Sequence, residues 1–224
     1  MLDRLRLWYY TETRKLLDLS WKEKIEYIWN YYKLWIIGIV AFLFLTIFLT
    51  IRITTNIEGY WLNGIFANTM ADAGTGSSLW EDFTDYADLD LKEKKLEFNA
   101  ESYFDYLKNQ AKGNNYYNAF VALTDAGVLD FVTMEPESLS ALAQSGRLAD
   151  LRLDRFRAIY TRWGDRLVYF ESAEGDRIPV GIDLSDSLLV TKYRLYPTGC
   201  ALGVCAHSEN LDTVALFLQF VLEE

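Results

Sequence analysis

Histidine, cysteine and proline are scarce in this chain, which has one, two and three of them among 224 residues. Two cysteines and one histidine cannot supply the four ligands of an ordinary zinc site, so we expect no metal. The lone His207 stands in a loop, and no Gly-x-Ser-x-Gly elbow, Walker-type loop or Rossmann fingerprint accompanies it. The sequence therefore predicts a protein that is not an enzyme, with no catalytic residue and no cofactor.

The two cysteines, Cys200 and Cys205, leave their redox state open. In a regular strand their side chains face opposite sides, about 16 Å apart, which is too far for a disulfide. A turn at Gly199 or Gly203 would instead allow a small-loop disulfide. Buried free thiols are the favoured interpretation, and the disulfide is the alternative.

Positive charge is also scarce after the first quarter of the chain. Residues 53–224 carry 14 Lys/Arg and 27 Asp/Glu, a net charge of −13, whereas residues 1–33 carry seven Lys/Arg and five Asp/Glu. An acidic domain repels phosphate backbones, which argues against nucleic acid as a partner. It also repels anionic lipid head groups, so we expect this domain to stand off the membrane.

A long uncharged apolar run, LWIIGIVAFLFLTIFLTI, occupies residues 34–51. Eighteen helical residues span about 27 Å, close to the hydrocarbon thickness of a bilayer. The Lys and Arg residues concentrate before the run, and after Arg52 none follows until Lys92. The positive-inside rule therefore predicts a cytoplasmic N-terminus and an extracellular C-terminal domain on a single-pass cell-membrane protein.

A cleaved signal peptide is the competing interpretation of this run. Signal peptides have a short leading region, an apolar stretch of about 7–15 residues and a small-x-small cleavage site. Here 33 residues precede the run, and the exit IRITTNIEGYW lacks that site. We expect an uncleaved anchor, with a stub at 1–33, a membrane helix at 34–53, a linker at 54–59 and an outer domain at 60–224.

The stub before the membrane helix is rich in aromatic residues. Ser20 and Glu23 fit a capping box that starts a helix. Apolar residues then recur at helical spacing from Trp21 to Tyr32, and we expect this helix to continue into the membrane. The stub either anchors and orients the protein in the lipid bilayer or docks against a partner membrane protein.

The outer domain alternates strand-like and helix-like segments. Strands are expected at Tyr60–Phe66, Lys95–Asn99, Leu129–Met134, Arg166–Glu171, Ile178–Ile182 and Cys200–Ala206. Helices are expected at Leu79–Tyr86, Ser102–Ala111, Tyr116–Leu123, Pro136–Gly146 and Asn210–Leu222. This alternation predicts an α/β domain with parallel strand pairing.

Three stretches in order resemble the type II periplasmic, or extracellular, solute-binding protein family. They are LDFVTMEPESLSALAQSGRLADL at 129–151, RIPVGIDLSDS at 177–187 and CALGVCAHSENLDTVALFLQFVL at 200–222. The resemblance implies that a strand ends at a cleft, a segment returns to the first lobe and a final helix repacks on that lobe. Only residues 151–185 remain for a second lobe, so the resemblance implies a reduced version of the fold.

Candidate ligand-binding residues follow from this fold expectation. Ligands of open α/β sheets bind at the carboxyl ends of strands and against helix N-termini. The positions expected there are Trp61, Asn63, Asn68, Thr75, Ser77, Ser78, Glu135, Asp183, Ser185 and Ser187. Trp163 is a second aromatic residue that would stack on a ligand. Ordinary capping and turn chemistry is the alternative role for each Ser, Thr, Asn and Asp residue.

Two classes of function remain after these exclusions. The first is a membrane-anchored binding module that captures a small solute or a peptide, or that serves as the accessory subunit of a transporter-type membrane assembly. The second is a purely structural or protein-interaction subunit without a small-molecule site. An enclosed pocket favours the first class, and a broad apolar surface favours the second.

Overall fold

The computed structural model describes residues 10, 14, 19–54, 59–106 and 113–223. It divides into two units, residues 1–56 and 57–224, which are described separately. The expected linker at 54–59 lies mostly outside the described residues, as do residues 107–111 of one expected helix.

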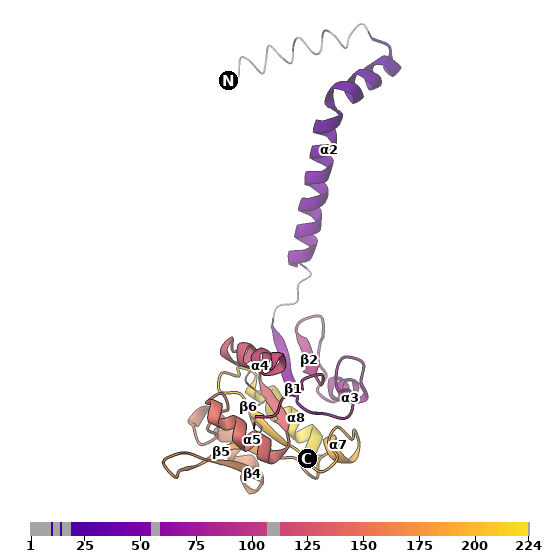
Figure 1. The fold of residues 1–224 in the computed structure, drawn as a ribbon. Coiled ribbons are helices and arrows are strands. Elements are labelled where there is room, and N and C mark those ends of the chain that lie inside the picture. The colour runs from indigo at the N-terminus through magenta and orange to yellow at the C-terminus, as the bar shows by residue number, and fades with distance from the viewer. Residues whose placement is uncertain (1–9, 11–13, 15–18, 55–58, 107–112, 224) are drawn as a thin grey trace. The chain divides into compact units, whose positions relative to one another are not determined.

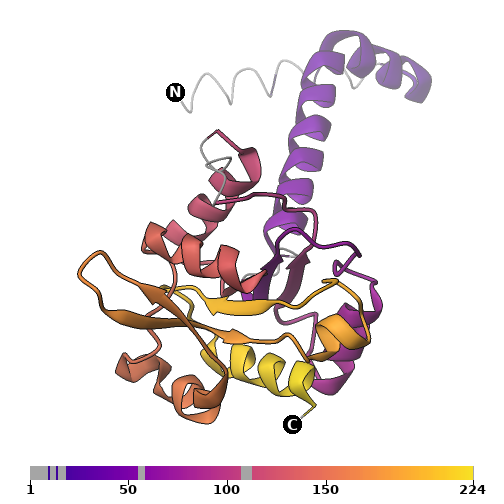
Figure 2. The same cartoon turned by 60° about the horizontal axis from the view of Figure 1, so that its bottom comes forward.

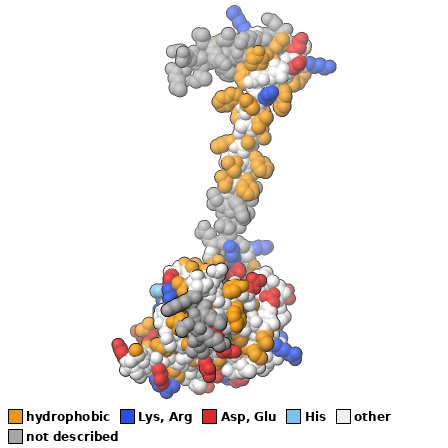
Figure 3. All heavy atoms as spheres, viewed as in Figure 1, with side chains coloured by type: hydrophobic (Ala, Val, Ile, Leu, Met, Phe, Trp, Pro, Cys, Tyr) orange, Lys and Arg blue, Asp and Glu red, His pale blue; other side chains and the backbone are white. Residues whose placement is uncertain are grey.

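The first unit is built on one continuous helix, α2 (Trp21–Thr54), drawn in Figure 1. The Ser20 backbone N–H donates to the Glu23 carboxylate at 2.8 Å, which confirms half of the expected capping box. Hydrophobic side chains surround much of the helix in Figure 3. The helix is long and apolar enough to cross a membrane, a property that an N-terminal signal sequence shares.

The second unit is a mixed α/β domain around a six-stranded sheet of order β2-β1-β3-β6-β5-β4. The strands are β1 (Tyr60–Phe66), β2 (Lys95–Asn99), β3 (Phe131–Met134), β4 (Leu167–Glu171), β5 (Arg177–Asp183) and β6 (Ala201–Val204). The α-helices are α3 (Ser78–Tyr86), α4 (Asn115–Asp125), α5 (Pro136–Leu142), α6 (Arg157–Arg162), α7 (Leu188–Thr191) and α8 (Leu211–Leu222). Short 3-10 turns lie at Ala143–Ser145, Asp154–Phe156 and Gly164–Arg166.

The expectation of parallel pairing is only half right. Strand β1 pairs parallel with β2 and β3, but β6 runs antiparallel to both β3 and β5, and β4 runs antiparallel to β5. The reason lies in the connections. Only five residues, Ser172–Asp176, join β4 to β5, and a parallel crossover needs a dozen or more.

One expected helix is wrong over its described part. Residues 102–106 form no helix, and this segment instead binds the loop after β1. The Asn68 backbone N–H donates to the Ser102 carbonyl at 2.9 Å, and the Phe104 side chain is buried. Contacts with another segment decide this conformation, because they outweigh a weak local helix preference.

The sheet lies between two layers of helices (Figure 2). One face carries the larger core, where Phe83 of α3, Trp163 after α6 and Phe217 of α8 are buried. The other face carries a second core, with Phe120 of α4 and Leu139 of α5. Burial of these large apolar side chains is the main source of stability for the domain.

Helix α5 packs unusually close to the sheet because two glycines face it. Gly181 of β5 and Gly203 of β6 are paired across the strands. A Cβ atom added at Gly181 would lie 2.6 Å from Leu139 Cδ2, and one added at Gly203 would lie 2.8 Å from Leu139 Cδ1. The absence of side chains at these two positions therefore allows α5 to pack this close to the sheet.

Candidate functional site

The carboxyl ends of the three parallel strands lie at one edge of the sheet, which we call the carboxyl edge. Met134, at the end of β3, pairs with Ala201 at the start of β6, and Ala201 pairs with Asp183 at the end of β5. Antiparallel strands therefore bring further polar residues to this edge. The predicted residues that the topology brings there are Asn68, Glu135, Asp183 and Ser185.

Asn68 joins two loops at the carboxyl edge. Its side-chain oxygen accepts from the Phe104 backbone N–H at 3.1 Å, and its Nδ2 donates to the Phe104 carbonyl at 3.0 Å. Its φ of 60° lies in the left-handed region, which asparagine tolerates better than most residues. Both ends of the amide are engaged in the protein, so turn chemistry accounts for this residue.

Tyr196 fills the space between the ends of β1 and β3, and sequence reasoning missed it. The residue is 2% exposed, and its hydroxyl lies 3.0 Å from the Thr133 carbonyl and 3.2 Å from the Ala67 carbonyl. The Thr133 hydroxyl is 2.8 Å away. Burial raises the pKa of the Tyr196 phenol well above its usual value. A protein side chain therefore occupies the position where a ligand was expected.

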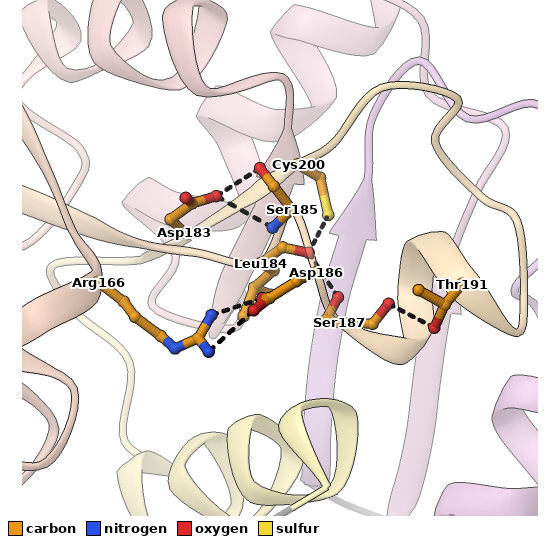
Figure 4. Close-up of polar contacts among 8 residues, drawn as sticks. All are labelled: Arg166, Asp183, Leu184, Ser185, Asp186, Ser187, Thr191 and Cys200. Carbon is orange, nitrogen blue, oxygen red and sulfur yellow. Dashed lines mark hydrogen bonds and ion pairs between the residues drawn. The ribbon is translucent and has the colours of Figure 1, made fainter.

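Three predicted residues shape the turn after β5 (Figure 4). The Asp183 carboxylate accepts from the Ser185 backbone N–H at 3.0 Å and from the Ser185 hydroxyl at 2.5 Å. The buried Ser187 hydroxyl donates to the Leu184 carbonyl at 2.6 Å. These are the local bonds by which Asp and Ser residues stabilise turns.

An ion pair on the same turn was not anticipated. The Arg166 guanidinium faces the Asp186 carboxylate, with two nitrogen–oxygen distances of 2.5 and 3.0 Å (Figure 4). Its hydrogen bonds hold the pKa of the Asp186 carboxyl below the usual range. The pair joins the turn to the segment that begins β4, and the Asp-Ser turn sequence carried no sign of this distant arginine.

The predicted residues around α3 divide into one cap and two free side chains. The Ser77 hydroxyl accepts from the Trp80 backbone N–H at 3.2 Å, which confirms it as the N-cap. The side chains of Thr75 and Ser78 are exposed and make no hydrogen bond within the described residues. Glu135, at the N-cap position of α5, is likewise exposed and makes no side-chain cap bond.

The predicted aromatic and amide residues of β1 serve other parts of the domain. The Trp61 indole donates to the Asp90 carbonyl at 3.0 Å, and the Lys94 ammonium lies 4.8 Å from its ring centroid. Asn63 is buried, and its Nδ2 donates to the Val128 carbonyl at 2.9 Å. Trp163 is 1% exposed and belongs to the core, so it has no face for a ligand.

The opposite end of β3 holds a buried carboxylate that sequence reasoning also missed. Asp130 is 1% exposed and accepts from the Asn63 backbone N–H at 2.8 Å and from the Ser208 hydroxyl at 2.7 Å. Asn210 Nδ2 adds contacts of 3.1 and 3.2 Å to the two carboxylate oxygens. These bonds connect β1, β3 and the start of α8, which is a structural role.

Hollows open on the surface of the described part of the domain, among them two lined by charged side chains. One, of 390 Å³, lies between α5 and the β4–β5 hairpin, where Ala141 and Phe170 are among its lining residues. The other, of 510 Å³, lies beside the end of α4 and is lined by residues that include Arg155 and His207. His207 is exposed there and makes no hydrogen bond within the described residues.

The part of the chain that the structure describes offers few side chains for metal binding or thiol chemistry. No group of three His, Cys, Asp or Glu side chains is placed there to hold a metal ion. Cys200 and Cys205 are free and buried, as the favoured interpretation expected. Burial raises the pKa of both thiols, so they stay protonated and do not act as nucleophiles at neutral pH.

Comparisons with known proteins give no assignment for this arrangement. No protein-family model matches the chain, and no curated protein or solved structure matches it either.

Proposed function

We propose that this protein is a membrane-anchored binding module whose acidic α/β domain lies outside the cell and contacts a protein partner, as the accessory subunit of a membrane assembly. Helix α2 serves as the single anchor, with the N-terminus in the cytoplasm. One transmembrane helix cannot conduct a solute alone, so any transport would be the work of partner subunits.

The filled carboxyl edge of the sheet at β1 and β3 is the observation that carries this proposal. The Tyr196 side chain is 2% exposed, and its hydroxyl lies between the ends of β1 and β3. Both the oxygen and the nitrogen of the Asn68 amide bond to Phe104. At β1 and β3, the edge that a solute-binding domain would use is thus filled by the domain itself. A domain whose own side chains fill this part of the edge suits a protein-contact role.

Solute capture is the second candidate, and the 510 Å³ hollow favours it. Its size falls in the range of small-molecule sites, and Arg155, His207 and Glu209 line it with both signs of charge. The Arg155 guanidinium, however, donates to the carbonyls of Ala206 and Ser208, which takes up part of its capacity.

The topology is tested by cysteine labelling in intact cells. Both native thiols are buried, so they give little background with a membrane-impermeant maleimide. Glu174→Cys, on the exposed β4–β5 turn, is expected to label from outside, and Lys22→Cys only after permeabilisation. Labelling in the reverse pattern would overturn the extracellular domain.

The partner is tested by purifying the full chain from its native membrane in mild detergent. We expect one membrane protein to co-purify at a fixed ratio and to survive size-exclusion chromatography. A protein that emerges alone with a bound small molecule would instead support solute capture. A protein that emerges alone and empty would overturn both candidates.

A further inference from the structure

The hollow of 390 Å³ runs between helix α5 and the last strand of the sheet, and we call it the α5–β4 groove. Helix α5 contributes Glu137, Ser140 and Ala141, whose spacing places them on one helical face. The Ser140 hydroxyl donates to the Tyr169 carbonyl at 2.9 Å and holds the helix against β4. The sheet order ends at β4, so within the described residues no strand lies on its outer side.

The charges at the groove are unequal. Glu137 and Glu171 are exposed carboxylates, and neither forms an ion pair within the described residues. The one cation that lines the groove, Arg177, lies over the Tyr169 ring at 4.5 Å from its centroid. With a net charge of −13 on residues 53–224, this surface attracts a cation rather than an anion.

Besides polar residues such as Ser140 and Gln144, the groove is lined by the apolar side chains of Ala141 and Phe170. Ala141 is 6% exposed, and its small side chain leaves room above it, while Phe170 is half-buried against the second core. Lysine and arginine carry a long aliphatic stem that packs on apolar surface and a charged end that stays near water or a carboxylate. One basic side chain therefore fits both parts of the groove.

We propose that the α5–β4 groove receives an extended segment of the protein partner, which lies along β4 and places a Lys or Arg side chain between Glu137 and Glu171. Addition of an extended peptide beside the final strand of a sheet is a common mode of recognition, in which pockets for alternate side chains give specificity. This inference rests on the proposed protein-contact function and names the chemistry of the contact.

The test uses the full chain in phosphatidylcholine nanodiscs and a fluorescent pentapeptide, Thr-Val-Lys-Val-Thr, with both ends blocked. We expect saturable binding that weakens about tenfold when the lysine is acetylated, because acetylation removes the charge. Glu137→Gln and Glu171→Gln should each weaken binding about two- to fivefold, as expected for an exposed ion pair. Glu174→Gln makes the same charge change on the hairpin turn outside the groove and should leave binding unchanged.

A steric variant distinguishes binding in the groove from a general attraction of the basic peptide to the acidic domain. Ala141→Leu fills the space without altering the charge and should abolish binding, with thermal unfolding of the domain as the check on its fold. Equal binding of the lysine and acetyl-lysine peptides, no binding of either, or an equal loss in Glu174→Gln would each overturn the proposal. If a membrane partner still co-purifies at a fixed ratio in those cases, only the groove is rejected and the proposed function stands.

Discussion

At the amino end of β3 a carboxylate fills the space between neighbouring strands, whereas at the carboxyl end a phenol does. Asp130 accepts hydrogen bonds from three residues, and Tyr196 shares one hydroxyl among Thr133 and Ala67. Both residues are at most 2% exposed. The comparison teaches that a protein side chain fills the space beside β1 and β3 at both ends, and that the loss of the carboxylate and the loss of the phenol would cost different amounts of stability.

The buried carboxylate should give the largest effect. Asp130→Ala leaves the Asn63 backbone N–H, the Ser208 hydroxyl and the Asn210 amide without their acceptor, and we expect a loss of about 3–5 kcal/mol in the free energy of unfolding. Urea unfolding of the full chain in detergent, followed by near-UV circular dichroism, measures it. Asp130→Asn keeps the shape and should cost less. A loss below about 1 kcal/mol in Asp130→Ala would contradict a network role.

The phenol should give a smaller effect. Tyr196→Phe removes one hydroxyl but keeps the ring, so we expect a loss of about 1–2 kcal/mol in the same unfolding measurement. Thr133→Val in the Tyr196→Phe background should add little, because the two hydroxyls share one interaction. Additive losses from the two changes would show that each hydroxyl has an independent partner.

A phenol and a carboxylate also meet directly, where Tyr193 donates to Asp82 at 2.7 Å beside Lys192. Burial, with Asp82 second, raises the pKa of Tyr193 to about 12. A pKa raised in the folded state stabilises the fold fully below pH 10 and loses this contribution as pH rises toward 12. Between pH 8 and pH 11 we expect the free energy of unfolding to fall by on the order of 1 kcal/mol less in Tyr193→Phe than in the unchanged protein. Urea midpoints at the two pH values measure this difference. Identical pH dependence in both proteins would refute the assignment.

The exposed ion pair should give the smallest effect. Arg166 lowers the pKa of Asp186, so its contribution is present above the ordinary carboxyl pKa of about 4 and is lost as pH falls below it. Because Asp186 keeps 67% of its side chain exposed, solvent screening limits the contribution to about 1 kcal/mol or less. Asp186→Asn should shift the urea midpoint slightly at pH 7 and not at pH 3. A large shift of the urea midpoint at pH 7 would contradict this limit and show that the ion pair stabilises the domain as much as a buried hydrogen-bond network does.

Much of the fold of the α/β domain was predictable from local pattern. Tyr60–Phe66 and Lys95–Asn99 are strands as expected, because alternating β-formers fit a half-buried sheet. Ser77 was identified as a cap because a hydroxyl before an apolar helical run satisfies free N–H groups. The direction of β4, β5 and β6 was not predictable in the same way, since it depends on connection length and on pairing between distant segments.

The sequence predicted the place of only some of the candidate residues, and it did not predict their hydrogen-bond partners. Topology brings Asn68, Glu135, Asp183 and Ser185 to the carboxyl edge, as expected of polar residues that follow strands. Their hydrogen bonds were not predictable, because Phe104 lies 36 residues from Asn68 and Tyr196 lies 63 residues from Thr133. No local signal marks such partners.

The sequence by itself determined that a helix with an uncharged apolar run precedes an acidic α/β domain, because hydrophobic periodicity and charge are properties of neighbouring residues. Only the tertiary structure decided that Tyr196 fills the carboxyl edge at β1 and β3, that Asp130 is buried with three donors, and that the groove opens between α5 and β4. These features arise where residues far apart in the chain meet, and the free energy that selects them comes from packing and hydrogen bonds across that distance.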